Sequence, residues 1–289
     1  MTAASVRAAL RALLASDQCV YPASVFDPLS ARVAGELGFE VAMFGGSTAA
    51  LTVLGGPDLV LLTLSEFAEQ ATRMCRVAEL PIIADADHGY GNALNARRTI
   101  EELQRAGIAG LCIEDTVLPV VYGPSGAMQL HSIAEGEAKL RAALDARTDP
   151  GLVIFGRTSA MSVNGLDDTL RRVERYSQTG VDGLFLVGVN TTEALAAISR
   201  ACDLPLVLAG ATPPVDRATL ARYRVRVCLQ GHQTILAAVQ AIHDCMKALR
   251  EGTAPRDLRG LASADLMRRL TREGEFEQWS VDFLGRESK

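Results

Sequence analysis

Short apolar segments alternate with amphipathic segments along most of this 289-residue chain. The short segments have the length and composition of buried strands, and each is followed by a pattern typical of a helix. The expected strands lie at 19–24, 40–44, 81–85, 110–115, 152–155, 183–187, 205–208 and 225–229. Strands that alternate with helices predict a parallel sheet, and about eight such units predict a closed barrel. An open, doubly wound sheet would need a switch point and typically fewer units, so we expect an α/β fold of the (β/α)8 TIM type.

This count divides the chain into one barrel domain and a C-terminal tail. Residues 1–252 form the predicted barrel, which includes a last helix at 234–250, and residues 253–289 form a C-terminal helical tail. The tail carries the single tryptophan, Trp279. Because the barrel is already complete, we expect the tail to pack on the outside of the barrel or on another subunit; a frayed terminal helix is the alternative.

Composition excludes several classes of function. The formal net charge is −5, the pI is about 5.5, and no run of like charges occurs, which argues against a nucleic-acid partner. No apolar run is long enough to cross a membrane, and the first residues lack the apolar region of a signal peptide. Six cysteines are scattered without metal-site spacing, so we expect buried free thiols and a cytoplasmic location.

Two carboxylates interrupt the third expected strand. Asp85 and Asp87 are two residues apart, so on a strand they would share one face, and burying them together requires a compensating cation. Gly89 and Gly91 then allow a tight turn and a close approach to a ligand. The alternative is a polar loop whose aspartates cap the next helix.

Further polar residues end the other strands, where a barrel of this type has its active face. They are Ser47, Glu114, Arg157 and His232, together with Asp85 and Asp87. Carboxylate oxygens suit Mg²⁺ or Mn²⁺, and a metal beside an arginine suits a small chelating anion such as a 2-oxo acid. Two structural alternatives remain: Arg157 could pair with Glu114 or Asp85, and His232 could be a hydrogen-bonded histidine without a catalytic role.

The order of these motifs resembles the isocitrate lyase and phosphoenolpyruvate mutase superfamily over nearly the whole chain. The motifs are Gly45-Gly46-Ser47, Pro57-Asp58, the segment 84–91, Ile113-Glu114-Asp115 and Arg157-Thr158. The resemblance implies a Mg²⁺ site in which Asp87 is the direct ligand and Asp58, Asp85 and Glu114 act through water. It further implies that Ser47 and the adjacent amides, including that of Gly46, hold the substrate carboxylate. Arg157 would hold the reacting oxygens.

Within the superfamily, the chain is most similar to the oxaloacetate decarboxylase branch. The shared features are Phe26-Asp27-Pro28, the segment 86–95 and Gly231-His232, while segment 118–126 lacks the lysine and cysteine of the carbon–carbon lyases. One departure is that segment 209–214 lacks the tyrosine that these decarboxylases carry after strand seven. The resemblance implies Mg²⁺-dependent decarboxylation of oxaloacetate to pyruvate and CO₂ through a metal-stabilised enolate. His232 would bind the departing carboxylate or relay a proton.

Other activities stay open at this point. The chain could cleave another 2-oxo acid or a C–C or P–C substrate of the superfamily, or it could bind a 2-oxo acid or oxalate without turnover. The resemblance also implies a homo-oligomer, a tetramer of helix-swapped dimers. The long segment 116–133 is expected to gate the site.

Overall fold

The computed structural model describes residues 2–119, 127–210 and 212–286. The chain forms two compact units, residues 1–232 and 233–289. We expected the division after residue 252, with the helix at 234–250 inside the barrel domain. Instead, that helix begins the second unit.

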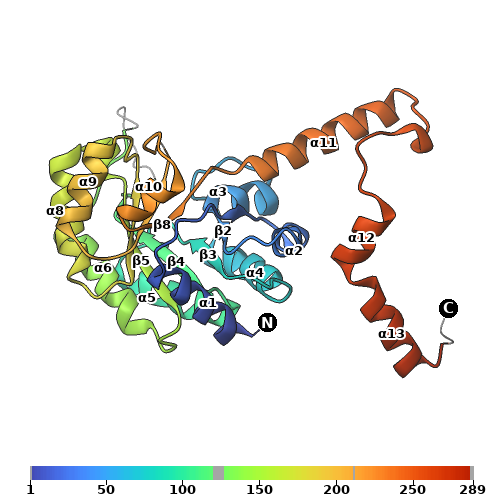
Figure 1. Cartoon of the computed structure of the whole chain (residues 1–289), viewed down its shortest axis with the longest axis horizontal. Helices are drawn as coiled ribbons and strands as arrows, with labels where there is room; N and C mark the ends of the chain where they lie inside the picture. The colour runs from blue at the N-terminus through green and yellow to red at the C-terminus, as the bar shows by residue number, and fades with distance from the viewer. Residues whose placement is uncertain (1, 120–126, 211, 287–289) are drawn as a thin grey trace. The chain divides into compact units, whose positions relative to one another are not determined.

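The first unit contains an eight-stranded parallel sheet in which the strands are paired in sequence order. Figure 1 labels several of these strands, with helices around them. A parallel bridge between Val20 and Val227 joins the last strand to the segment before the first, so the sheet closes on itself. The predicted α/β barrel is therefore confirmed. Its strands are β1 (Ala23–Ser24), β2 (Ala42–Phe44), β3 (Ile82–Asp85), β4 (Gly110–Glu114), β5 (Val153–Thr158), β6 (Gly183–Val187), β7 (Leu206–Ala209) and β8 (Val225–Cys228).

Helices connect these strands, and local sequence signals fix their ends. Asn92 caps the helix at 93–106, and Gly107 ends it with a left-handed φ of 93°, a conformation that favours glycine. The helices of this unit are α1 (Ala3–Ala15), α2 (Pro28–Glu36), α3 (Gly46–Ala49), η1 (Ala50–Leu54), α4 (Leu64–Cys75), α5 (Ala93–Ala106), α6 (Ile133–Ala146), α7 (Ala160–Val163), α8 (Leu166–Ser177), α9 (Thr192–Ala201) and α10 (Arg217–Arg222).

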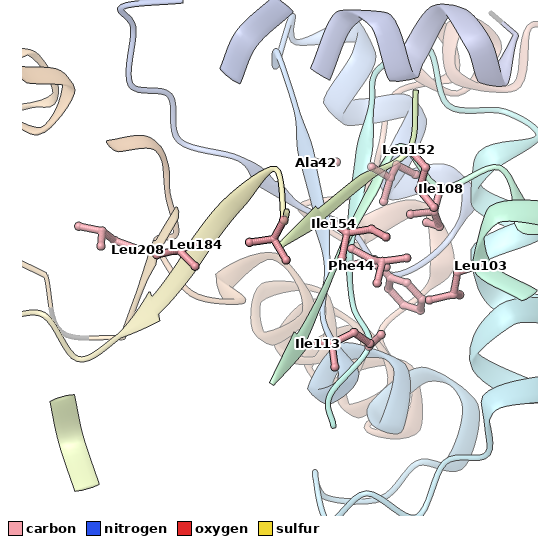
Figure 2. Close-up of a cluster of buried hydrophobic side chains, with 14 of the residues drawn as sticks. Ala42, Phe44, Leu103, Ile108, Ile113, Leu152, Ile154, Leu184 and Leu208 are labelled. Atoms are coloured by element: carbon pink, nitrogen blue, oxygen red, sulfur yellow. The ribbon is translucent and has the colours of Figure 1, made fainter. Parts of the chain in front are cut away.

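Side chains that alternate along the strands form two apolar layers. The layer between the strands and the helices includes Phe44, Ile113 and Ile154, and Figure 2 shows part of it. The other layer fills the barrel and includes Met43, Cys112 and Phe155. A strand buried on both faces accounts for the continuous apolar runs in the sequence.

Helix α1 closes the barrel at the amino ends of the strands. Its buried Leu10 belongs to the inner layer, and a side chain on Gly110 would place its Cβ 2.8 Å from the Leu10 Cδ2 atom. The buried Arg7 Nε donates to the carbonyl oxygen of Ile108 at 3.0 Å. Helix α1 does not cover the opposite end of the barrel, where the strands have their carboxyl ends, so a functional site can form there.

The second unit is helical: α11 (Gln233–Arg250), η2 (Pro255–Asp257), α12 (Ala264–Thr271) and α13 (Glu273–Leu284). Arg268 of α12 forms ion pairs with Glu273 and Glu277 of α13, at 3.2 and 3.1 Å. Phe276 and Trp279 pack edge to face with 5.0 Å between ring centroids. No helix in the described ranges is both long and apolar enough to cross a bilayer.

Candidate active site

The predicted site residues all lie at the carboxyl end of the barrel. Asp85 ends β3, Glu114 ends β4, and Arg157 lies near the end of β5. Ser47 follows β2 in α3, and His232 follows β8. The parallel register pairs Glu114 directly with Arg157 across adjacent strands.

Asp85 is the centre of a hydrogen-bond cluster. Its Oδ1 atom accepts from the Nη1 of Arg157, from the backbone N–H of Asp87 at 3.2 Å and from the Cys112 thiol at 3.4 Å. Arg157 Nε also lies 3.1 Å from Glu114 Oε2, but its N–H is not directed at that oxygen, so this contact is an ion pair without a hydrogen bond. The side chain of Arg157 is therefore held by two carboxylates. This is the ion pairing that the sequence left open for Arg157, and the residue also lies at the barrel mouth.

The structure separates the roles of two adjacent acids, Glu114 and Asp115. Asp115 Oδ2 accepts from Arg172 Nη1 at 2.7 Å and from the Tyr176 hydroxyl at 2.8 Å, both on α8. This buried network ties Asp115 to the helix layer, and it leaves Glu114 beside Arg157.

Asp87 corrects one expectation from the sequence. We expected Asp85 and Asp87 to share one strand face, but β3 ends at Asp85, and Asp87 adopts a left-handed φ of 46°. Aspartate tolerates this conformation better than most residues do, because its short side chain bonds locally. A Cβ on Gly46 would lie 3.0 Å from both carboxylate oxygens of Asp87, so the glycine lets the end of β2 approach this carboxylate.

His232 is held between two strand ends. Its Nδ1 atom lies 2.7 Å from Ser24 Oγ at the end of β1. On the other side, a Cβ on Gly45 would lie 2.8 Å from the ring atoms Nε2 and Cε1. Burial lowers the pKa of His232, although the charges of Asp85 and Asp58 oppose this, and the direction favours the neutral ring.

Ser47 and Asp58 complete the predicted set. Ser47 lies in the first turn of α3, whose amide N–H groups have no acceptor within the helix. Burial and the nearby charge of Asp85 raise the pKa of Asp58, while Arg157 and His232 act in the opposite direction. Asp58 therefore belongs to the same electrostatic cluster.

This cluster contains four carboxylates, those of Asp58, Asp85, Asp87 and Glu114, and the Arg157 guanidinium. Burial raises the pKa of Asp87 well above its usual range, and the charges of Asp85 and Glu114 add to the effect. Glu114 is buried, Asp85 and Asp87 are half-buried, and Asp58 is exposed. Such an excess of clustered negative charge fits a divalent cation, which would stabilise the ionised acids. Within the described ranges, no three His, Cys, Asp or Glu side chains are arranged as a direct metal-ligand group. The predicted Mg²⁺ site needs only one direct protein ligand, the carboxylate of Asp87, because the other acids would act through water.

The sequence carried no signal for three features of this site. They are the roles of Ser24 and Cys112 and the contact of Gly45 with His232. Cys112 lies in a continuous apolar run and differs from its neighbours only by a thiol. Ser24 directly precedes the Val25-Phe26-Asp27 segment, but no local pattern relates it to His232, which lies far along the chain. Only the closure of the barrel brings the two together.

Two predicted segments are only partly described. Thr116 and Leu130 form an antiparallel bridge at the base of the expected gating segment, whereas residues 120–126 lie outside the described residues. In segment 209–214, which lacks the expected tyrosine, Ala211 also lies outside them. Gating by 116–133 therefore stays a prediction.

Comparisons with known proteins agree with this architecture and chemistry. The sequence model described as "Phosphoenolpyruvate phosphomutase" matches residues 10–250. An oxaloacetate decarboxylase of Rhodopseudomonas palustris (strain BisA53) is 53% identical over 280 residues, which cover 96% of each chain.

Solved structures are similar over almost the whole chain. The phosphoenolpyruvate phosphomutase of Streptomyces platensis subsp. rosaceus shares 28% identity, with a TM-score of 0.86, over 96% of this chain and 99% of that chain. A phosphonopyruvate hydrolase in complex with oxalate and Mg²⁺ shares 26% identity, with a TM-score of 0.85, over 98% and 100%. The chain belongs to the phosphoenolpyruvate phosphomutase family, within the isocitrate lyase superfamily whose motifs it carries.

Proposed function

We propose that this chain is a lyase that decarboxylates oxaloacetate to pyruvate and CO₂. The observation that carries the proposal is the cluster of carboxylates around Arg157 at the barrel mouth, with His232 at another strand end of the same face. Full-length relatives named oxaloacetate decarboxylase, at 52–53% identity, support this choice of substrate.

We further propose Mg²⁺ as the cofactor, with Mn²⁺ as the substitute. The excess of carboxylates fits a hard divalent cation, and a related hydrolase was solved with Mg²⁺ and oxalate. Asp87 would hold the ion directly, and Asp58, Asp85 and Glu114 would hold its water ligands. When bound, the ion would orient a 2-oxo acid and withdraw electrons from its keto oxygen.

The protein residues supply the remaining steps. The first-turn amides at Gly46 and Ser47 would bind the C1 carboxylate, and Arg157 would stabilise the negative charge that develops on the C2 oxygen as the C3–C4 bond breaks. Asp85 and Glu114 hold the guanidinium in place before substrate arrives, so little reorganisation accompanies the reaction. His232 would contact the C4 carboxylate that leaves as CO₂.

The test is pyruvate formation from oxaloacetate with Mg²⁺, with Mn²⁺ and with EDTA, each corrected for the metal-only reaction. We expect turnover that EDTA abolishes and that falls by at least about 100-fold in Asp87→Ala and Arg157→Ala. Asp203→Ala is the matched control, because its side chain is fully exposed on the barrel unit. Oxalate binding that needs Mg²⁺, without turnover, would contradict the proposed activity and would favour a binding protein or a larger 2-oxo acid.

We also propose that the chain forms helix-swapped homo-oligomers in the cytoplasm. Helix α11 exposes an apolar stripe formed by Leu236, Val239, Ile242, Met246 and Leu249. Beside β8, the barrel unit has a hollow of about 350 Å³ lined in part by Tyr21, Leu220 and Cys228. A helix from a second copy would cover such a surface.

Free thiols at all six cysteines support the proposed compartment, the cytoplasm.

A further inference from the structure

Ser24 lies close to the seam where the barrel closes on itself, four residues after Val20, which bridges to β8. It is the last residue of β1, and β1 follows the segment that bridges to β8. Its side chain is buried, with 8% of the residue exposed, and its Oγ atom lies 2.7 Å from the Nδ1 of His232. This distance is a short hydrogen bond, so Ser24 contacts one specific nitrogen of the ring.

Gly45 fixes the opposite edge of the same ring. A Cβ on Gly45 would come within 2.8 Å of both Nε2 and Cε1, so these two atoms pack directly against the backbone at the end of β2. The segment that follows contains Gly46 and Ser47, the proposed carboxylate-binding residues. Nδ1 contacts Ser24, and Nε2 lies beside the end of β2 that leads into Gly46 and Ser47, so a flipped ring would lose the Ser24 contact.

The two nitrogens of a neutral imidazole differ, because one carries the proton and the other accepts. A serine hydroxyl matches either arrangement, since it can both donate and accept. A substrate carboxylate offers only acceptors, so a neutral His232 can attract it only with the proton on Nε2.

We propose that Ser24 is a positioning residue that donates its hydroxyl hydrogen to Nδ1 of His232 and thereby keeps the ring proton on Nε2, facing the carboxylate that leaves. This inference rests on the proposed decarboxylation. In that step the C3–C4 bond breaks, its electron pair forms the enolate of pyruvate, and CO₂ departs while His232 keeps its proton; a proton from water then goes to C3 to give pyruvate. A neutral donor orients the carboxylate, whereas a cation would stabilise the ground state that must lose this charge.

The direct test is the tautomer of His232, measured by long-range ¹H–¹⁵N spectra of protein labelled with ¹⁵N-histidine. The chain has four histidines, so a His232→Gln spectrum identifies the signal by its loss. We expect a protonated Nε2 in the wild type, mixed tautomers in Ser24→Ala and restored Nε2 protonation in Ser24→Thr. A wild-type proton on Nδ1, or a tautomer that Ser24→Ala leaves unchanged, would overturn the assignment.

Kinetics provide the second test. We expect kcat for oxaloacetate to fall about 10-fold in Ser24→Ala and to recover largely in Ser24→Thr, as for other residues that orient a catalytic group. Ser177→Ala is the matched control, because its hydroxyl bonds only a local carbonyl at the end of α8. An unchanged kcat in a folded Ser24→Ala protein would contradict the proposal. Absent wild-type turnover with the expected tautomer would instead refute the decarboxylase activity and leave the Ser24–His232 contact standing.

Discussion

At the scale of single residues, the site depends on two adjacent glycines at the end of β2. Gly45 packs against His232, and Gly46 packs against the carboxylate of Asp87. Neither glycine has a left-handed φ, so backbone conformation does not require glycine at these positions. Glycine is needed because a side chain would occupy the space that His232 and Asp87 fill. Both contacts join β2 to residues far along the chain, which is how neighbouring strand ends come to form one site.

Gly45→Ala tests this contact. The backbone of Gly45, with φ of −90° and ψ of 150°, accepts alanine, but the new Cβ would come 2.8 Å from the His232 ring. We expect kcat/KM for oxaloacetate to fall by at least about 10-fold, because displacing a catalytic group by about 1 Å is that costly. In Gly56→Ala, whose Cβ would meet only Leu54 at 3.8 Å, activity should remain unchanged. Equal activity in both variants would contradict the steric argument.

The neutral state of His232 predicts a pH dependence. Burial lowers the pKa of this ring below 6.5, and the charges of Asp85 and Asp58 limit the shift. Activity should therefore be complete above pH 6.5 and decline as the pH falls through the lowered pKa, because protonation turns Nδ1 into a donor toward Ser24. The measurement is kcat/KM between pH 5 and 8, corrected for the metal-only reaction. In His232→Gln, the same acidic decline should be absent.

At the scale of elements, helix α4 shows how local chemistry sets a boundary. Thr63 and Ser65 both stand near its start and both carry a hydroxyl that could cap it. The cap is Thr63, whose side chain accepts from the backbone of Glu66, while Glu66 accepts from the backbone N–H of Thr63 at 2.9 Å. This reciprocal Thr-x-x-Glu pattern satisfies two free N–H groups, which a serine at the second helical position cannot do.

A pair of substitutions distinguishes the two candidate caps. Thr63→Ala should lower the free energy of unfolding by about 1 kcal/mol through loss of the cap. Ser65→Ala should change it by less than about 0.5 kcal/mol, because alanine is the better helix former at this exposed position. Urea unfolding followed by circular dichroism measures both. A larger loss in Ser65→Ala than in Thr63→Ala would refute the assignment.

At the scale of the whole molecule, the apolar stripe on α11 predicts self-association. Ile242 lies in the middle of this stripe and is 55% exposed. A glutamate there would place a charge in the proposed contact between copies, which costs several kcal/mol when it is buried and unpaired. We expect Ile242→Glu to reduce the mass measured by light scattering to that of a smaller species. Gln240→Glu, on the same helix, is the control. A wild-type monomer would contradict the proposed oligomer.

The sequence by itself determined the barrel and the order of its strands, because the periods of apolar residues and the capping signals are local properties of the chain. It also placed Asp85, Glu114, Arg157 and His232 at one end, since parallel strands present their carboxyl ends on the same face. The family assignment from these motifs is confirmed by the matched family model.

Only the tertiary structure decided which of these side chains touch. The register between β4 and β5 sets Glu114 opposite Arg157, and barrel closure brings Ser24 to His232. The left-handed turn at Asp87 likewise has no signal in the alternating pattern. Such contacts depend on sheet register, closure and burial, which arise from residues far apart in the chain, so no local period of the sequence encodes them.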